Sequence, residues 1–175
     1  MKKLREKFYY KDKEFYKIIK DIVNHEEFLK IKKIKHHGIN RFNHSLRVSY
    51  YTYKLAKLLG FNYIEATRGA LLHDFFLDEL KNDGTLKSLH HHPRYALKNA
   101  NKYFKLTRRE KNIILSHMFP VGLNVPRYKE SWLVDIIDDI CSCYERFYST
   151  TEIINRLTIF IMIFTFAKLR LLICY

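Results

Sequence analysis

The sequence predicts an all-α fold, and three observations support this prediction. The chain of 175 residues contains only five glycines and three prolines, whereas an all-β fold needs many turns. Apolar residues recur along most of the chain at the three- and four-residue spacing of amphipathic helices. No stretch shows the apolar–polar alternation of a half-buried strand. We therefore expect about seven or eight helices in one helical bundle.

The N-terminal region, residues 1–37, is predicted to form two helices. The first has an apolar face of residues at helical spacing, namely Phe15, Ile18, Ile19, Ile22 and Val23. A shorter second helix contains the next apolar group, Phe28, Leu29, Ile31 and Ile34. Gly38 then interrupts the pattern.

Two helices are predicted in the next part of the chain. The first extends from Phe42 to Leu59, and Gly60 ends it because glycine is favoured just after a helix C-terminus. Asn62 and Glu65 resemble a capping box, so the second helix is expected from about Tyr63 to His73.

A turn and two further helices follow. Asp83-Gly84 marks the turn, and His92-Pro93 predicts a helix start, because proline is tolerated at the first helical position. Thr107 with Glu110 forms a second capping-box pattern, which opens a helix through Met118.

The C-terminal third contains a loop and two predicted helices. Pro120, Gly122 and Pro126 mark the loop, and the helix after it is expected from about Ser131 to Phe147. The last helix, over residues 151–175, includes the apolar run Leu157–Ala167. This run has eleven residues, whereas a membrane-spanning helix needs about 20. We expect it to pack on the core or in a homodimer, with a membrane-surface helix as the alternative.

Composition indicates one globular domain over residues 1–175, because 47% of the residues are apolar and no linker divides the chain. The three cysteines, Cys141, Cys143 and Cys174, include no CxxC pair, which favours a reduced, cytoplasmic protein. The net charge of +14 would attract phosphates, nucleic acid or anionic lipid. A general compositional bias towards lysine would produce the same charge, so charge alone does not identify the partner.

The adjacent pair His73-Asp74 is the sharpest local feature of the sequence. Imidazole nitrogens and carboxylate oxygens are both good ligands for a divalent ion, although such a pair also occurs at helix caps and on surfaces. A helical bundle can bring ligands from separate helices to one centre. Further potential ligands lie on separate predicted helices: His44, His92, His117 and Asp138.

The order of these residues resembles that of the HD superfamily of metal-dependent phosphohydrolases, and in particular small bacterial HD domain proteins. The similarity covers roughly residues 38–147. The runs that carry it are His44-Ser45-Leu46-Arg47-Val48, Gly69-Ala70-Leu71-Leu72-His73-Asp74-Phe75, His92-Pro93, Ser116-His117-Met118 and Trp132-Leu133-Val134-Asp135-Ile136-Ile137-Asp138.

The resemblance implies that His44, His73, Asp74 and Asp138 form the core metal site. It further implies that His92 and His117 could hold a second metal ion. Alternatives to these roles exist for several of the residues. His44 could be a core histidine, Asp135 or Asp139 could replace Asp138 as the ligand, and His92 and His117 could be a helix cap and a buried polar residue.

These observations predict a hydrolase that cleaves a phosphate ester of a small metabolite or nucleotide through a metal-activated water, with His73 and Asp74 at its catalytic centre. The donor atoms suit one or two ions of Fe, Mn, Zn, Ni or Co. Arg47, one turn after His44, is predicted to contact the substrate phosphate, with a structural salt bridge as the alternative. The alternative function is a basic nucleic-acid-binding or regulatory protein with a structural or inactive metal site.

Overall fold

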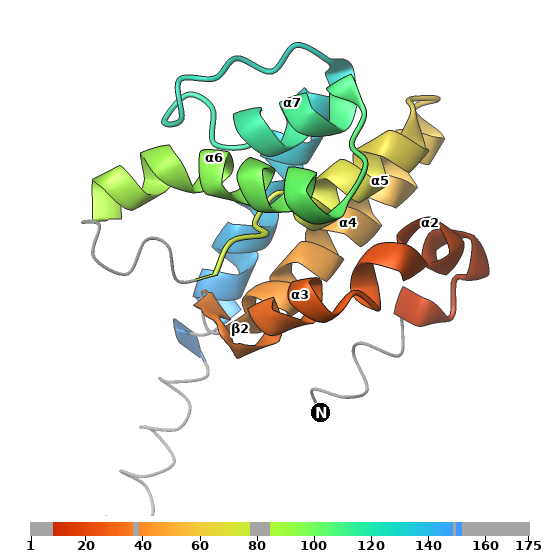
Figure 1. The fold of residues 1–175 in the computed structure, drawn as a ribbon, viewed down its shortest axis with the longest axis horizontal. Coiled ribbons are helices and arrows are strands. Elements are labelled where there is room, and N and C mark those ends of the chain that lie inside the picture. The colour runs from red at the N-terminus through yellow and green to blue at the C-terminus, as the bar shows by residue number, and fades with distance from the viewer. Residues whose placement is uncertain (1–8, 37–38, 78–84, 149, 152–175) are drawn as a thin grey trace, which may run out of the picture.

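The structure is a computed structural model that describes residues 9–36, 39–77, 85–148 and 150–151. Helices make up most of the described chain, which confirms the all-α prediction (Figure 1). The predicted turn at Asp83-Gly84 and the apolar run Leu157–Ala167 lie outside the described residues. Among the helices that are described, none has the length and apolar character that spanning a membrane requires.

The N-terminal helices form where the sequence predicts them. Helix α2 (Lys13–Val23) begins after Asp12, whose carboxylate accepts a hydrogen bond from the backbone nitrogen of Phe15. The second predicted helix is divided into a short helix α3 (Glu26–Leu29) and a 3-10 helix η1 (Lys30–Lys33).

A short hairpin connects these helices to the rest of the fold. Strands β1 (Lys35–His36) and β2 (Ile39–Asn40) pair antiparallel. The sequence pattern did not predict them, because two residues are too few to show alternation. Asn40 then caps helix α4 (Arg41–Leu58) by accepting a hydrogen bond from the backbone nitrogen of Asn43.

The predicted end of one helix before Gly60 and the predicted start of the next at Tyr63 are confirmed. Only one of the two bonds of the predicted capping box between Asn62 and Glu65 differs from the expected pattern. Gly60 follows α4 with a φ of 65°, a conformation that suits glycine. Helix α5 (Tyr63–Leu72) is capped by the side chain of Asn62, which accepts from the nitrogen of Glu65. The backbone nitrogen of Asn62 donates instead to Glu130, from a helix that spans residues 129–148.

The predicted start of the next helix at His92-Pro93 is wrong, because helix α6 (Thr85–Tyr103) begins earlier and contains Pro93. Proline removes one backbone hydrogen bond and so weakens a helix without preventing it. Packing of α6 against helix α7 (Arg108–Ser116) provides stabilisation that the local pattern does not show.

Two more predicted helices are observed, and the last one, predicted over residues 151–175, lies almost entirely outside the described residues. The capping box at the start of α7 has both of its hydrogen bonds, between Thr107 and Glu110, and α7 ends slightly before the predicted Met118. The helix over residues 129–148 extends a little beyond the predicted Ser131–Phe147 at both ends.

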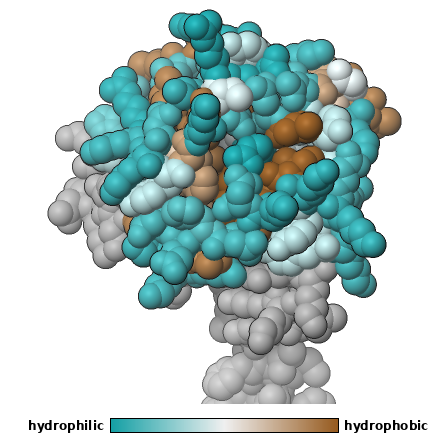
Figure 2. Space-filling view, turned by 45° about the vertical axis from the view of Figure 1, so that its right-hand side comes forward, coloured by the Kyte–Doolittle hydropathy of each residue, from teal (hydrophilic) through white to brown (hydrophobic). Residues whose placement is uncertain are grey.

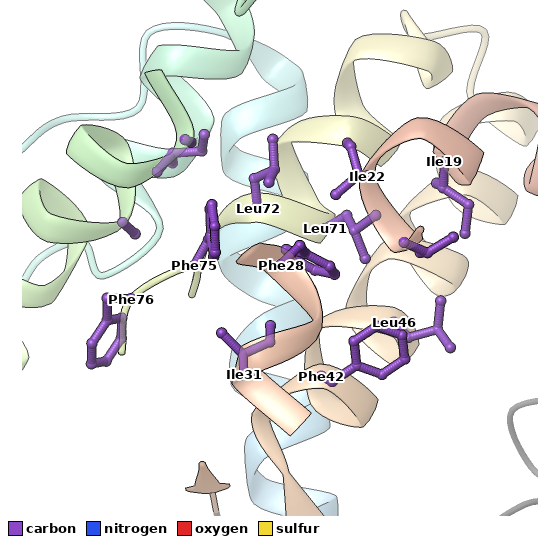
Figure 3. Close-up of a cluster of buried hydrophobic side chains, with 14 of the residues drawn as sticks. Ile19, Ile22, Phe28, Ile31, Phe42, Leu46, Leu71, Leu72, Phe75 and Phe76 are labelled. Carbon is purple, nitrogen blue, oxygen red and sulfur yellow. The ribbon is translucent and has the colours of Figure 1, made fainter. Parts of the chain in front are cut away.

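The larger apolar core surrounds the end of α5 and fixes the segment that carries the His-Asp pair. Leu71 and Leu72 precede this pair and Phe75 and Phe76 follow it, and all four side chains are buried (Figure 3). Phe75 packs against Phe28, with ring centroids 5.4 Å apart. Each such buried side chain contributes about 1.5–3 kcal/mol, so the pair is held firmly from both sides.

A second apolar cluster joins α4, α5, α7 and the helix over residues 129–148; it contains Val48, Ala70, Ile113, Val134, Ile137 and Cys141. Here α5 and α7 approach closely at Gly69. A Cβ atom at this position would lie 2.9 Å from Cγ2 of Ile113. Glycine is therefore needed for the distance at which these two helices pack.

Replacement of Gly69 by alanine is expected to lower the free energy of unfolding by about 1–2 kcal/mol. Alanine favours a helix by up to about 1 kcal/mol over glycine, but overpacking against the fully buried Ile113 outweighs this gain. Urea unfolding of Gly69→Ala measures the change. The same substitution in an Ile113→Ala background should be neutral or stabilising; equal destabilisation in both backgrounds would contradict the steric explanation.

Candidate metal centre

Among the residues whose burial is described, most charged side chains are at least partly exposed, and the face drawn in Figure 2 is mostly hydrophilic. Burying a charged or strongly polar group is unfavourable unless it is paired or binds a metal. A buried group of such side chains therefore marks a site with a specific role. The structure brings together the six residues predicted as metal ligands, and all of them are buried: His44, His73, Asp74, His92, His117 and Asp138.

Different elements supply the six side chains. Helices α4 and α6 carry His44 and His92, and the helix over residues 129–148 carries Asp138. His73 and His117 are the C-cap residues of α5 and α7. The potential ligand atoms form three overlapping groups, within each of which all atoms lie within 4.8 Å of one another.

Asp74 lies between the two halves of this cluster. Its Oδ1 atom is 3.5 Å from Nε2 of His92 and 3.8 Å from Nε2 of His117. Its Oδ2 atom is 3.9 Å from Nε2 of His73. Oδ1 of Asp74 therefore faces His92 and His117, the residues predicted to hold a second metal ion. Oδ2 faces His73, a residue of the predicted core metal site.

Asp138, rather than Asp135 or Asp139, reaches the cluster from its helix. Its Oδ1 atom is 2.8 Å from Nε2 of His44 and 3.5 Å from Nε2 of His73. Burial alone raises the pKa of Asp138, but the positive charges that His73 and His44 can carry outweigh burial and hold this pKa well below its ordinary value. The Asp138 carboxylate is therefore ionised and available to a cation.

Hydrogen bonds at the outer nitrogens orient the histidine rings. Nδ1 of His73 donates to the carbonyl oxygen of Ala70 at 2.7 Å, and Nδ1 of His117 donates to that of Ile114 at 2.8 Å. A carbonyl can only accept, so each Nδ1 carries the proton of the neutral ring. In that neutral form, the lone pair of each ring is on Nε2, which faces the cluster.

The inner nitrogens fit a bound cation. Among the described residues, Nε2 of His73 has no hydrogen-bond partner although it is buried. Nε2 of His117 faces Nε2 of His92 at 2.9 Å. Burial and the charges of His73 and His92 lower the pKa of His117 to about 3, so its ring is neutral. Converging nitrogen and carboxylate donors of this kind suit Fe, Mn, Zn, Co or Ni.

Arg41 also contacts the cluster, and the sequence pattern did not predict this role. It is buried, its Nε atom lies 3.8 Å from Oδ2 of Asp74, and its NH1 nitrogen donates to the carbonyl of Phe76 at 2.6 Å. Its guanidinium stacks on the Phe76 ring, which in turn stacks on His92. The position of Arg41 three residues before His44, on a neighbouring part of the helix surface, is the signal that could have identified it.

Arg47 forms the salt bridge that the sequence left open as an alternative. Its guanidinium donates to Glu145, and this carboxylate also accepts from Nδ1 of His44 at 2.9 Å. The substrate contact predicted for Arg47 remains a prediction. His90 and His91 lie outside the three groups of potential ligands.

Metal binding is expected to strengthen with pH, because a proton competes for His44. Burial lowers the pKa of His44, but hydrogen bonds to Asp138 and Glu145 outweigh burial and raise this pKa to about 10. Below that pH the metal-free ring is charged and has no lone pair on Nε2. Metal affinity should therefore rise about tenfold per pH unit between pH 6 and 8. Zinc titrations against a competing chelator at several pH values measure this affinity. A zinc affinity that does not change with pH would contradict a protonated His44 ring.

Comparison with known proteins gives one match. The family model of the HD domain matches residues 41–142, which is more than half of the chain. Neither the curated proteins nor the solved structures include a significant match. The match contains all six clustered residues, from His44 to Asp138. The chain therefore belongs to the HD domain family, within the superfamily of metal-dependent phosphohydrolases.

Proposed function

We propose that this protein hydrolyses a phosphate ester of a small metabolite or nucleotide at the cluster of His44, His73, Asp74, His92, His117 and Asp138. One observation carries the proposal: the ring nitrogens and carboxylates of six buried residues converge from separate elements. Such a donor set would hold one or two divalent ions. When bound, these ions would lower the pKa of a water molecule and offset charge on phosphoryl oxygens.

The residues of the chain have distinct proposed roles. Asp74 would bridge the two halves of the site, because its two oxygens face different histidines. His73 would hold its ring fixed through the hydrogen bond to Ala70, with Nε2 directed at the centre. Burial of these groups keeps the local dielectric constant low, which strengthens each charge interaction with the substrate.

Substrate would enter from the side of the cluster that retains some exposure. His44, His73 and His117 are at most 1% exposed, whereas Arg41, His92 and Asp138 are each 7% exposed. Arg41 would then lie beside the entering substrate, with its guanidinium held by the carbonyl and ring of Phe76. A planar guanidinium matches two oxygens of a phosphate, so Arg41 is our candidate for the phosphate contact.

The proposal is tested by the metal content and phosphatase activity of the full chain. Wild-type protein should contain one or two transition-metal ions per chain and hydrolyse a panel of phosphate monoesters, diesters and nucleotides. His73→Ala and Asp74→Ala should lose the metal and at least about 99% of the activity, because each removes a ligand. His90→Ala, a half-buried histidine on α6 outside the cluster, is the control. Full activity in the two ligand variants would refute the proposal.

Substitution of Arg41 tests the proposed phosphate contact. Arg41→Met should lower kcat/KM by about 10–100-fold, because a hydrogen bond to a charged group is worth about 1.5–3 kcal/mol. Arg41→Lys keeps the charge but loses the planar fork, so it should fall between Arg41→Met and wild type. Steady-state kinetics at saturating metal measure these values. If Arg41→Met retains the wild-type kcat/KM, Arg41 does not contact the substrate.

A second candidate function is nucleic-acid binding, and the distribution of lysines in the N-terminal helices favours it. Seven lysines between residues 9 and 33 are exposed: Lys11, Lys13, Lys17, Lys20, Lys30, Lys32 and Lys33. Three of the acidic residues among them, Asp12, Glu14 and Asp21, form ion pairs with Lys54, Lys57 and Arg68, whereas Glu27 pairs with Lys30. If this function holds, RNA or DNA binding should weaken steeply with salt and persist after metal removal.

A further inference from the structure

Glu145 is a buried acid that the proposed reaction does not use directly. It lies on the helix over residues 129–148, three residues beyond the end of the match to the HD domain at residue 142. Its side chain is only 1% exposed. A buried carboxylate needs partners, and both of its oxygens have one.

The two partners of Glu145 connect it to the candidate metal centre. Its Oε2 atom accepts a hydrogen bond from Nδ1 of His44 at 2.9 Å, while Nε2 of the same ring lies 2.8 Å from Asp138. Its Oε1 atom accepts from the guanidinium of Arg47. Arg47 thus fixes one oxygen of the carboxylate, and the other oxygen fixes the ring of His44.

This arrangement distinguishes His44 from two other histidines of the cluster. His73 and His117 each donate to an uncharged backbone carbonyl three residues earlier in the chain. His44 instead contacts a charged carboxylate. A carboxylate behind a histidine ring makes the opposite nitrogen a stronger metal ligand and fixes its direction.

Arg47 also has contacts outside the cluster. It borders a cavity of about 470 Å³ whose lining includes Tyr51, Leu55 and Ile140 and none of the six clustered residues. Its guanidinium carbon also lies 5.4 Å from the centroid of the Tyr144 ring. Arg47 therefore both holds Glu145 and borders a largely apolar cavity.

We propose that Glu145 is a positioning residue, held by Arg47, that orients His44 and gives the His44 half of the centre the higher metal affinity. The proposal rests on the proposed function, because it treats the cluster as a metal site. It predicts an order of filling: the first ion occupies the half formed by His44, His73, Asp74 and Asp138, and the half with His92 and His117 fills at higher metal concentration.

The test compares two substitutions of Glu145 with a matched control in the full chain. Glu145→Gln keeps an oxygen that can accept from His44 but removes the charge, and Glu145→Leu removes both. The control is Glu130→Gln on the same helix, because Glu130 is also buried and paired with an arginine, Arg109, but lies outside the cluster. The three variants therefore separate loss of a buried acid from loss of the His44 contact.

Co²⁺ titrations followed by visible absorption and competition with a chelator give the affinity of each half. We expect the first Co²⁺ to bind about tenfold more weakly in Glu145→Gln and about 100-fold more weakly in Glu145→Leu, with an altered absorption spectrum. These are pH-independent affinities, obtained from titrations at several pH values, because Glu145 also strengthens the binding of the proton that the metal displaces from His44. Glu130→Gln should match wild type in affinity and spectrum, even if its thermal stability falls. Wild-type affinity and spectrum in both Glu145 variants would overturn the proposal, and if Glu145→Leu does not fold, Glu145→Gln decides.

Arg47 provides an independent check. Arg47→Met should weaken binding of the first Co²⁺ in the wild-type background and have no further effect in the Glu145→Leu background, because it acts only through Glu145. An equal effect in both backgrounds would overturn the assignment of Arg47. If the Glu145 variants bind the first Co²⁺ as tightly as the wild type, and the wild type hydrolyses phosphate esters, only this inference is refuted. Absence of metal binding in the wild type refutes the proposed function as well.

Discussion

Six histidine and aspartate side chains are almost completely buried in this fold, and their burial is the constraint on which the rest of the structure depends. Such burial is unfavourable unless every polar atom is compensated. The outer nitrogens of three rings have hydrogen-bond partners that compensate their burial. His73 and His117 donate to backbone carbonyls, and His44 donates to a carboxylate. The nitrogens that face inwards remain directed at one another and at Asp74 and Asp138, an arrangement that a divalent cation stabilises.

Apolar packing makes this arrangement possible, because it positions the backbone independently of the polar groups. The His73-Asp74 pair lies between two pairs of buried apolar residues at the end of α5. The close approach at Gly69 fixes α5 against α7, and α7 ends at His117. The candidate ligands His73 and His117 are the C-cap residues of α5 and α7. Their relative position therefore depends on the close packing of these two helices at Gly69. The geometry of the site and the stability of the core are consequently coupled.

Two arginines on α4 flank His44 at equal sequence distance and differ in their surroundings. Arg41 contacts Asp74 and the ring of Phe76. Arg47 contacts Glu145 and borders an apolar cavity. Arg47 was predicted to contact the substrate because it lies one turn after His44 on the same helix face. Arg41 lies at the same distance before His44, so this spacing does not distinguish the two arginines. The placement of the helix over residues 129–148 gives them different partners.

The sequence by itself determined the helical class, most helix boundaries and the group of histidines and aspartates that meet. Caps at Asn62 and Thr107 and apolar spacing act over three or four residues, so they can be identified in the sequence. Only the tertiary structure decided the start of α6, the position of Arg41 and the contact between His44 and Glu145. These last two residues are 101 positions apart, and a contact over that distance depends on how helices pack. No local spacing in the sequence encodes it.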